Sequence, residues 1–292
     1  MTQTGNKVEV AIRRSDKLGE CPVWDGESQA LYWVDSRAPA LHRMTGTKFD
    51  SWSMPETIGS FGLCRQGKMI LALQSGIYAF DPTTAEMKVL AQPEADRPTN
   101  RFNDGRCDRR GRFWAGTMSD VSREPLGSLY RLHPDGKCIR IFGGIIVPNS
   151  ISWSPDNQVM YFADTYQQCI WAFDFELETG ELSQRRVFRD THGHPGKPDG
   201  SGIDTEGCLW NCEYGGWRIV RYDPSGKIDR IVPLPVANPT CCAFGAGDLR
   251  TLFVTSATQR LTPEQMAEQP LAGSVFAIQM DVGGLPEARF GG

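Results

Sequence analysis

The sequence has no long apolar run, little net charge and no recognisable targeting segment. Its uncharged apolar stretches are far shorter than the roughly 20 residues that a membrane-spanning helix needs. The formal net charge of −4 over 292 residues gives no basic surface for nucleic acid or for an anionic membrane. The segment 1–17 lacks the apolar core and the cleavage site of a secretory signal. We therefore expect a soluble, cytoplasmic protein whose partner is neither a membrane nor a nucleic acid.

Pairs of cysteines at metal-binding spacing are also missing, although nine cysteines are present. No CxxC motif occurs, and Cys208 and Cys212 have no histidines at zinc-finger spacing. We expect reduced thiols that serve as small core residues, as in cytosolic proteins. The sequence has no GxSxG motif and no plausible Ser, His and Asp set, which argues against a covalent serine mechanism.

Short strand-like runs that repeat along the chain dominate the rest of the sequence. Six units begin near residues 20, 60, 103, 149, 199 and 240. Their spacing of roughly 40 to 50 residues is that of a four-stranded propeller blade. Each unit alternates β-branched and aromatic runs with hairpin turns that contain Asp, Gly or Ser. We predict an all-β fold, a six-bladed β-propeller with four-stranded antiparallel blades, as a single domain over residues 1–292.

Segments outside the repeated pattern complete this prediction. Residues 7–13 alternate like a strand, which we expect to pair with the last blade and close the ring. The segment 261–269 is the one stretch with a helical pattern. The long connections 117–127 and 256–273 are expected to be lids or specificity loops.

One position of the repeat is polar in all six units. It lies four residues before the apolar anchor of each first strand and holds Glu20, Ser60, Asn103, Asn149, Asp199 and Thr240. First strands line the central channel of a propeller, so these side chains should form a ring. The stretches 103–105 (Asn-Asp-Gly) and 198–200 (Pro-Asp-Gly) are also typical of ordinary turns, and this alternative stays open.

The composition of the ring indicates a metal site. Two carboxylates in a channel repel each other and lose hydration, and a divalent cation relieves both effects. We predict one divalent metal ion with four candidate ligands, Glu20, Asn103, Asn149 and Asp199. Oxygen ligands favour Ca²⁺, Mg²⁺ or Mn²⁺, while Zn²⁺ and Fe²⁺ also accept them and stay open.

The ends of the second strands should lie beside the ring, because antiparallel neighbours run in opposite directions. Residues that follow these strands are therefore candidate substrate-binding residues: Met118, Asp120, Tyr166, Glu213 and Tyr214. Surface packing is the alternative for the two tyrosines. His192 and His194 are close enough in sequence to reach the channel mouth, and we interpret them as loop residues rather than ligands.

Several motifs resemble a known family. The most specific is Arg101-Phe102-Asn103-Asp104-Gly105 with GRFWAGTM at 111–118, and PNSISWS at 148–154 and PDG at 198–200 support it. With these motifs, the sequence resembles the regucalcin/gluconolactonase family of six-bladed propellers from residue 18 to 276. Within that family it is most similar to bacterial sugar lactonases.

The resemblance implies site residues and an activity. It implies one divalent metal on Glu20, Asn149 and Asp199, with Asn103 close by, and whether Asn103 binds the metal or only the substrate stays open. It also implies lactonase activity, with Arg101 as a substrate contact and Asp199 as the general base.

The sequence departs from the family pattern at two positions. Ser150 stands where the family usually has Gly after the ligand Asn, so we expect a narrower pocket or an added hydroxyl. Cys21, where Ser or Gly is common, is a smaller departure.

These inferences predict metal-dependent hydrolysis of a sugar-acid lactone to the open-chain acid. The metal would polarise the carbonyl, Asp199 would take a proton from water, and Arg101 would bind hydroxyls or anionic substituents. Two alternatives remain, which are another metal-dependent esterase or organophosphate hydrolase on the same scaffold, and a non-catalytic metal-binding propeller. The identity of the sugar, the metal and the oligomeric state stay open.

Overall fold

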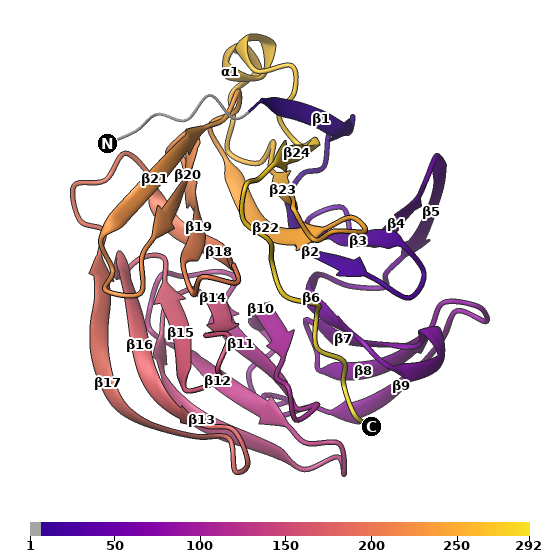
Figure 1. Cartoon of the computed structure of the whole chain (residues 1–292). Coiled ribbons are helices and arrows are strands. Elements are labelled where there is room, and N and C mark those ends of the chain that lie inside the picture. The colour runs from indigo at the N-terminus through magenta and orange to yellow at the C-terminus, as the bar shows by residue number, and fades with distance from the viewer. Residues whose placement is uncertain (1–6) are drawn as a thin grey trace.

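Six four-stranded antiparallel sheets stand around a central axis in the computed structural model, which describes residues 7–292 (Figure 1). The first blade contains β2 (Gly19–Asp25), β3 (Ala30–Asp35), β4 (Ala40–Thr45) and β5 (Lys48–Ser53). The second contains β6 (Ile58–Leu63), β7 (Met69–Leu73), β8 (Ile77–Asp81) and β9 (Glu86–Ala91), with a 3₁₀ turn at Arg65–Gly67. The third contains β10 (Asn100–Cys107), β11 (Phe113–Ser119), β12 (Gly127–Leu132) and β13 (Cys138–Ile145).

The remaining blades repeat this meander. The fourth contains β14 (Pro148–Trp153), β15 (Val159–Asp164), β16 (Cys169–Glu176) and β17 (Glu181–Asp190). The fifth contains β18 (Lys197–Ile203), β19 (Leu209–Tyr214), β20 (Arg218–Tyr222) and β21 (Ile228–Pro233). The sixth contains β22 (Pro239–Gly245), β23 (Thr251–Ser256), β24 (Val275–Gln279) and β1 (Val8–Ile12). The predicted six-bladed propeller is confirmed, and residues 1–6 of the predicted domain lie outside the described residues.

The ring closes through the N-terminal strand. β1 is the outer strand of the sixth blade and pairs with β24, with Val8 opposite Ile278. This confirms the predicted closure, which leaves fewer unpaired sheet edges. The predicted helical segment contains α1 (Pro263–Glu268), which begins at a capping box between Thr262 and Gln265.

Buried tryptophans anchor three of the second strands. Each is fully buried and donates its indole hydrogen to a buried aspartate before or within the same blade, which satisfies the one polar atom of the ring. The pairs are Trp33 with Asp16, Trp114 with Asp108, and Trp210 with Asp204. Truncation of such a side chain costs about 3–5 kcal/mol, so these anchors hold the blades in place.

Every inner strand is irregular at the position of the polar ring. Each pairing of a first strand with a second strand has a register shift there, typical of a β-bulge, which re-aims side chains. The shifts lie between Glu20 and Val23, Ile58 and Ser60, Phe102 and Gly105, Asn149 and Ser152, Pro198 and Ser201, and Pro239 and Cys242. The same irregularity therefore recurs at the position of the polar ring in all six blades.

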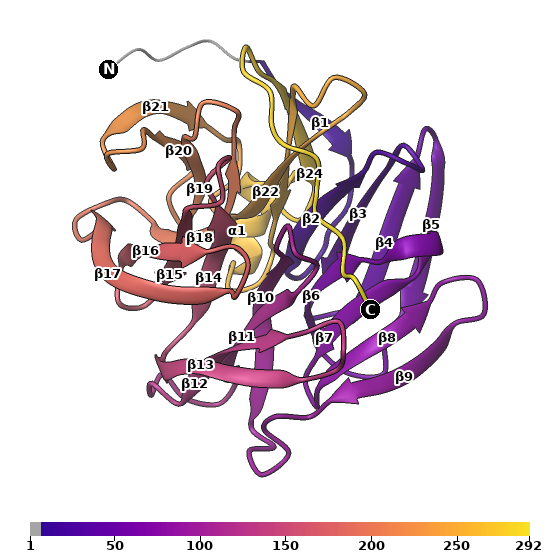
Figure 2. The ribbon, with the colours of Figure 1, turned by 60° about the horizontal axis from the view of Figure 1, so that its bottom comes forward.

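The C-terminal segment crosses the channel at the end where the inner strands finish, near Leu63 of β6 and Asp204 after β18. In Figures 1 and 2 the yellow ribbon after β24 runs from the sixth blade toward the second. It forms isolated bridges from Gly284 to Asp204 and from Arg289 to Leu63. Arg289 also forms an ion pair with Asp25. The segment thus ties the fifth, first and second blades together.

Two expectations from composition can be compared with the structure. All nine cysteines are free, and seven of them are buried, as expected for core residues. Within residues 7–292, no helix combines the length and the hydropathy that a bilayer crossing requires.

Candidate active site

A cavity of ≈ 320 Å³ opens at the end of the channel where the inner strands begin. Four of the six ring residues line it: Glu20, Asn103, Asn149 and Asp199. The stretches 103–105 and 198–200 lie inside β10 and β18, so the alternative interpretation as ordinary turns is wrong. The bulges of these strands explain why turn-like residues are found there.

The two hydroxyl residues of the ring do not line this cavity. Thr240 is fully buried and donates a hydrogen bond to the carbonyl of Gly19 at 2.5 Å. Ser60 is also fully buried, and its hydroxyl oxygen makes no hydrogen bond. The open part of the ring is thus made of the two carboxylates and the two carboxamides.

A chain of hydrogen bonds fixes the two carboxamides. Arg101 Nη1 donates to Asn103 Oδ1 at 2.8 Å, and Asn103 Nδ2 donates to Asn149 Oδ1 at 3.1 Å. Asn149 Nδ2 donates to Thr165 Oγ1 at 2.7 Å, and this hydroxyl donates to the carbonyl of Pro198 at 2.8 Å. Because the Asn103 oxygen faces a guanidinium, the Asn149 oxygen is the better placed of the two for a cation.

The two carboxylates lie in an environment that opposes their charge. Asp199 is 5% exposed, and no ion pair joins Glu20 or Asp199 to a basic side chain of the described residues. Burial raises the pKa of Glu20 well above its usual value, and the charges of Asp199 and Asp104 raise it further. Burial and the charge of Asp104 likewise raise the pKa of Asp199. A divalent cation between the two acids would offset their desolvation and mutual repulsion, so the oxygen donors of this site fit such an ion.

Asp104 is a third acid of the channel that the sequence interpretation missed. Its Oδ2 accepts a hydrogen bond from the backbone N–H of Ile151 at 2.9 Å, and burial raises its pKa. Among residues 7–292, no group of three or more His, Cys, Asp or Glu side chains is arranged to hold a metal ion. A cation at this site would therefore depend on an amide oxygen as well as on Glu20 and Asp199.

Arg101 is held at the cavity wall by a shared carboxylate. It is 3% exposed, and its Nε donates to Asp120 Oδ1 at 2.8 Å. Arg37 donates two further hydrogen bonds to the same carboxylate, at 2.8 and 2.5 Å. These contacts hold the pKa of Asp120 well below its usual range. Arg101 and Arg37 line the cavity, whereas Asp120 lies behind them and orients them.

The other predicted pocket residues divide into two groups. Met118, Tyr166 and Tyr214 line the cavity. Glu213 does not, because it is fully buried against His194 Nδ1 and Arg218 Nε, each at 2.7 Å.

Neither histidine of the 192–194 loop lines the cavity. His194 belongs to the buried Glu213 cluster, while His192 is exposed and pairs with Asp190 at 2.6 Å.

Four basic residues of the cavity were not predicted: Arg37, Arg123, Lys197 and Arg260. Two of them come from the long connections that were expected to be specificity loops, Arg123 from 117–127 and Arg260 from 256–273. The length of these loops was a usable signal, but loop sequence alone does not tell which side chain turns inward.

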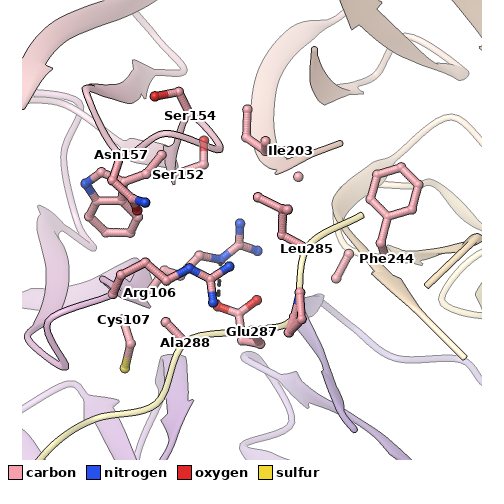
Figure 3. Close-up of a pocket in the computed structure, with 15 residues that line it drawn as sticks. Arg106, Cys107, Ser152, Ser154, Asn157, Ile203, Phe244, Leu285, Glu287 and Ala288 are labelled. Atoms are coloured by element: carbon pink, nitrogen blue, oxygen red, sulfur yellow. Dashed lines mark ion pairs between the residues drawn. The ribbon is translucent and has the colours of Figure 1, made fainter. Parts of the chain in front are cut away.

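A second cavity lies at the other end of the channel, beneath the C-terminal segment. Its volume is ≈ 60 Å³, and Figure 3 shows Arg106 and Glu287 facing each other across it. They form an ion pair at 3.5 Å, and Arg106 also donates to the carbonyl of Ser201 at 3.0 Å. The carboxylate of Glu287 is already paired with Arg106, and none of the predicted site residues lines this second cavity. We therefore do not take it as the candidate active site.

Comparisons with known proteins give one consistent family. Residues 18–258 match the SMP-30/gluconolactonase/LRE-like region. The 6-deoxy-6-sulfogluconolactonase of Pseudomonas putida is 37% identical over 98% of this chain and 99% of its own. A putative sugar lactone lactonase of Bacillus subtilis, YvrE, is 34% identical over 94% of this chain and 95% of its own.

Solved structures agree with the sequence relatives. The calcium-binding protein regucalcin from Agrobacterium tumefaciens superposes with a TM-score of 0.92 at 30% identity, and covers 96% of this chain and 97% of its own. The six-bladed architecture, the matched region and these relatives together confirm the resemblance found in the motifs. The chain belongs to the SMP-30/gluconolactonase/LRE-like family.

Proposed function

We propose that this protein hydrolyses a sugar lactone in a metal-dependent reaction, and that the cavity at the channel mouth is its active site. The protein is a sugar lactonase, the activity for which two of its relatives are named. The observation that carries the metal dependence is the pair of carboxylates, Glu20 and Asp199, which line one cavity and form no ion pair with a basic side chain of the described residues.

Glu20, Asn149 and Asp199 would hold the cation. Bound there, a divalent ion would supply Lewis-acid polarisation of the lactone carbonyl. Asn103 orients the Asn149 oxygen and is itself occupied by Arg101. Oxygen ligands favour Ca²⁺, Mg²⁺ or Mn²⁺, with Zn²⁺ or Fe²⁺ also compatible. The related regucalcin structure is that of a calcium-binding protein, which supports a divalent ion.

Asp199 is the proposed general base. Its carboxylate forms part of the cavity wall and makes no ion pair with a basic side chain of the described residues. It can therefore accept the proton of a water molecule that attacks the lactone carbonyl. Its backbone carbonyl accepts hydrogen bonds from Ser150 Oγ at 2.5 Å and Asn211 Nδ2 at 3.0 Å, which fix its position.

Arg101 is the proposed contact to the substrate hydroxyls. Asp120 and Asn103 both accept hydrogen bonds from it, so its guanidinium is held in one orientation. Met118 and Tyr214 line the same cavity and complete a wall with both apolar and polar parts. Such a wall suits a ligand with hydroxyl groups on a carbon ring.

The test is a panel of sugar lactones and an aryl ester of the paraoxon type. The protein is stripped with a chelator and assayed alone and with each of Ca²⁺, Mg²⁺, Mn²⁺, Zn²⁺ and Fe²⁺. We expect lactone hydrolysis that requires an added metal and is lost in E20Q and D199N, while circular dichroism shows a folded propeller. E86Q, which changes an exposed acid on β9, serves as the matched control and should keep full activity.

Other outcomes would identify the alternatives. A higher kcat/KM for the aryl ester than for every lactone would indicate an esterase or organophosphate hydrolase. Metal binding without turnover of any substrate would indicate a non-catalytic propeller. Undiminished lactone hydrolysis by the metal-free protein would disprove the metal dependence.

A further inference from the structure

Basic side chains outnumber the two acids, Glu20 and Asp199, in the lining of the cavity, although the whole chain has a formal net charge of −4. Five cationic side chains line it: Arg37, Arg101, Arg123, Lys197 and Arg260. Asp120 neutralises part of this charge through its ion pairs with Arg37 and Arg101. The other three cations have no carboxylate partner among the described residues.

These three cations surround a single aromatic side chain. The Arg123 guanidinium carbon lies 4.6 Å from the centre of the Tyr166 ring, and Lys197 Nζ lies 4.0 Å from it. Arg260 Nη1 donates a hydrogen bond to the Tyr166 hydroxyl at 3.0 Å. Tyr166 thus contacts all three cations, two through its ring and one through its hydroxyl.

Different blades supply these residues. Arg123 lies on the connection after β11, Tyr166 follows β15, Lys197 begins β18, and Arg260 lies on the connection after β23. The gathering is therefore a product of the folded ring and not of a basic run in the sequence. Three like charges around one ring repel one another, and an anionic ligand at this end of the cavity would reduce that repulsion.

Charge also affects Tyr166 itself. Burial acts to raise the pKa of its hydroxyl, but the hydrogen bond from Arg260 and the charges of Arg123, Arg260 and Lys197 outweigh burial and lower it. Tyr166 lines the cavity together with these three cations, so the cluster borders the cavity.

The cluster shares its cavity with the proposed metal site. Glu20 and Asp199 line the same ≈ 320 Å³ volume as Arg123, Lys197 and Arg260. A volume of this size is at the lower end of the range for sites that enclose a small molecule. A single sugar lactone can therefore present its carbonyl to the acids and a distant substituent to the cations.

Resting on the lactonase function proposed above, we propose that the substrate is a sugar lactone with an anionic substituent, bound by Arg123, Lys197 and Arg260 beside Tyr166. Sulfonate, phosphate and carboxylate groups share the oxygen acceptors that this cluster recognises.

The experiment compares kcat/KM for four lactones with the metal-loaded protein. The neutral probe is glucono-1,5-lactone. The anionic probes are its 6-phosphate, its 6-deoxy-6-sulfo derivative and a glucarolactone, which distinguish phosphate, sulfonate and carboxylate. We expect at least one anionic lactone to exceed the neutral one by roughly tenfold or more, the size expected for a charge-assisted contact. Added salt should reduce this advantage.

Three variants test the residues. R123Q, K197Q and R260Q should each lower the ratio of anionic to neutral kcat/KM by about tenfold. R186Q changes an exposed arginine that pairs with Asp174 outside the cavity, and it should leave the ratio unchanged. Neutral lactones used as well as anionic ones, or a ratio that the three variants do not change, would overturn the inference while leaving the lactonase function intact.

Equilibrium binding separates this inference from the proposed function. If no lactone is hydrolysed with any metal, the lactonase function fails, and calorimetry with 6-phosphogluconate and gluconate still tests the cation cluster. Tighter binding of the phosphate by tenfold or more, lost in R260Q, would support the cluster as an anion site. Equal affinities for both acids would overturn it.

Discussion

Asn103 donates a hydrogen bond from Nδ2 to Oδ1 of Asn149 at 3.1 Å, which joins the third and fourth blades at the channel mouth. Asn103 is fixed in turn by Arg101. The oxygen proposed to bind metal therefore takes its orientation from a neighbouring blade. Such supporting contacts commonly influence metal affinity as well as geometry.

The first prediction concerns this contact. N103A should weaken divalent-cation binding by about tenfold or more, because the Asn149 oxygen loses its orienting donor. Calcium titration by calorimetry would measure the change. Cation affinity equal to that of the unaltered protein would show that Asn149 needs no support from Asn103.

Asp120 should influence substrate binding through Arg101 more than it influences metal binding, which it reaches only through Arg101 and Asn103. D120N removes the charge that Arg37 and Arg101 share, and we expect kcat/KM for the lactone to fall by about tenfold. Steady-state kinetics and a parallel cation titration would separate the two effects. D281N is the matched control, since Asp281 also accepts two hydrogen bonds from an arginine, Arg230, but is exposed and does not line the cavity. A loss of cation affinity in D120N as large as that in N103A would contradict the assignment.

Removal of a buried acid should stabilise the metal-free protein. Without a cation, Glu20 and Asp199 are like charges whose pKa values are raised by desolvation and mutual repulsion, and D199N should raise the free energy of unfolding by about 1 kcal/mol or more. Urea denaturation in chelator would measure this difference.

Metal should reverse the order of stability. A cation present at 100 times its dissociation constant stabilises the native state by about 2.7 kcal/mol. Addition of Ca²⁺ should thus raise the Tm of the unaltered protein and not that of D199N. An equal shift in both proteins would place the bound ion elsewhere.

Ser150 offers a paired test of backbone strain and hydrogen bonding. Its φ of 62° lies in the left-handed region, where glycine is favoured, and its hydroxyl donates to the carbonyl of Asp199. S150A and S150G both lose this bond, but only S150G also relieves the strain. We expect S150G to be more stable than S150A by about 1 kcal/mol, measured by urea denaturation. Equal stability would mean that the backbone conformation is not strained.

Acid should weaken the fold through His42. Burial and the charge of Arg14 lower the pKa of this imidazole to about 4, from its usual value of 6.5. The unfolded chain therefore binds the proton first as the pH falls, and stability declines between about pH 6.5 and pH 4, on the order of 2–3 kcal/mol in all. H42Q should show a flatter decline over that range. Parallel pH profiles for both proteins would contradict this role.

The fold could be predicted because its signal repeats. Six similar units, regular turn residues and the alternating N-terminal segment all indicate the same ring, and tertiary structure agrees with each local preference. The ring of polar residues was also predictable from alignment of the units. Four of its members share the cavity, but Ser60 and Thr240 do not, because packing between blades covers them.

The cavity wall was harder to predict. Meander topology placed Met118, Tyr166 and Tyr214 correctly, whereas Glu213, one residue before Tyr214, turns to the other face of β19 because successive strand residues alternate. Arg123 and Arg260 were missed because loop conformation decides which side chains point inward. No local pattern encodes that decision.

The position of the C-terminal segment bears on where the substrate enters and the product leaves. Glu287 of this segment pairs with Arg106 at one end of the channel, whereas the candidate active site opens at the other end, so we expect lactone and acid to use that opening. The released acid, an anion, must leave past the same arginines that a new substrate molecule meets first. Product inhibition should accordingly be competitive, and a tag fused after Gly292 would stand on the side that neither molecule uses.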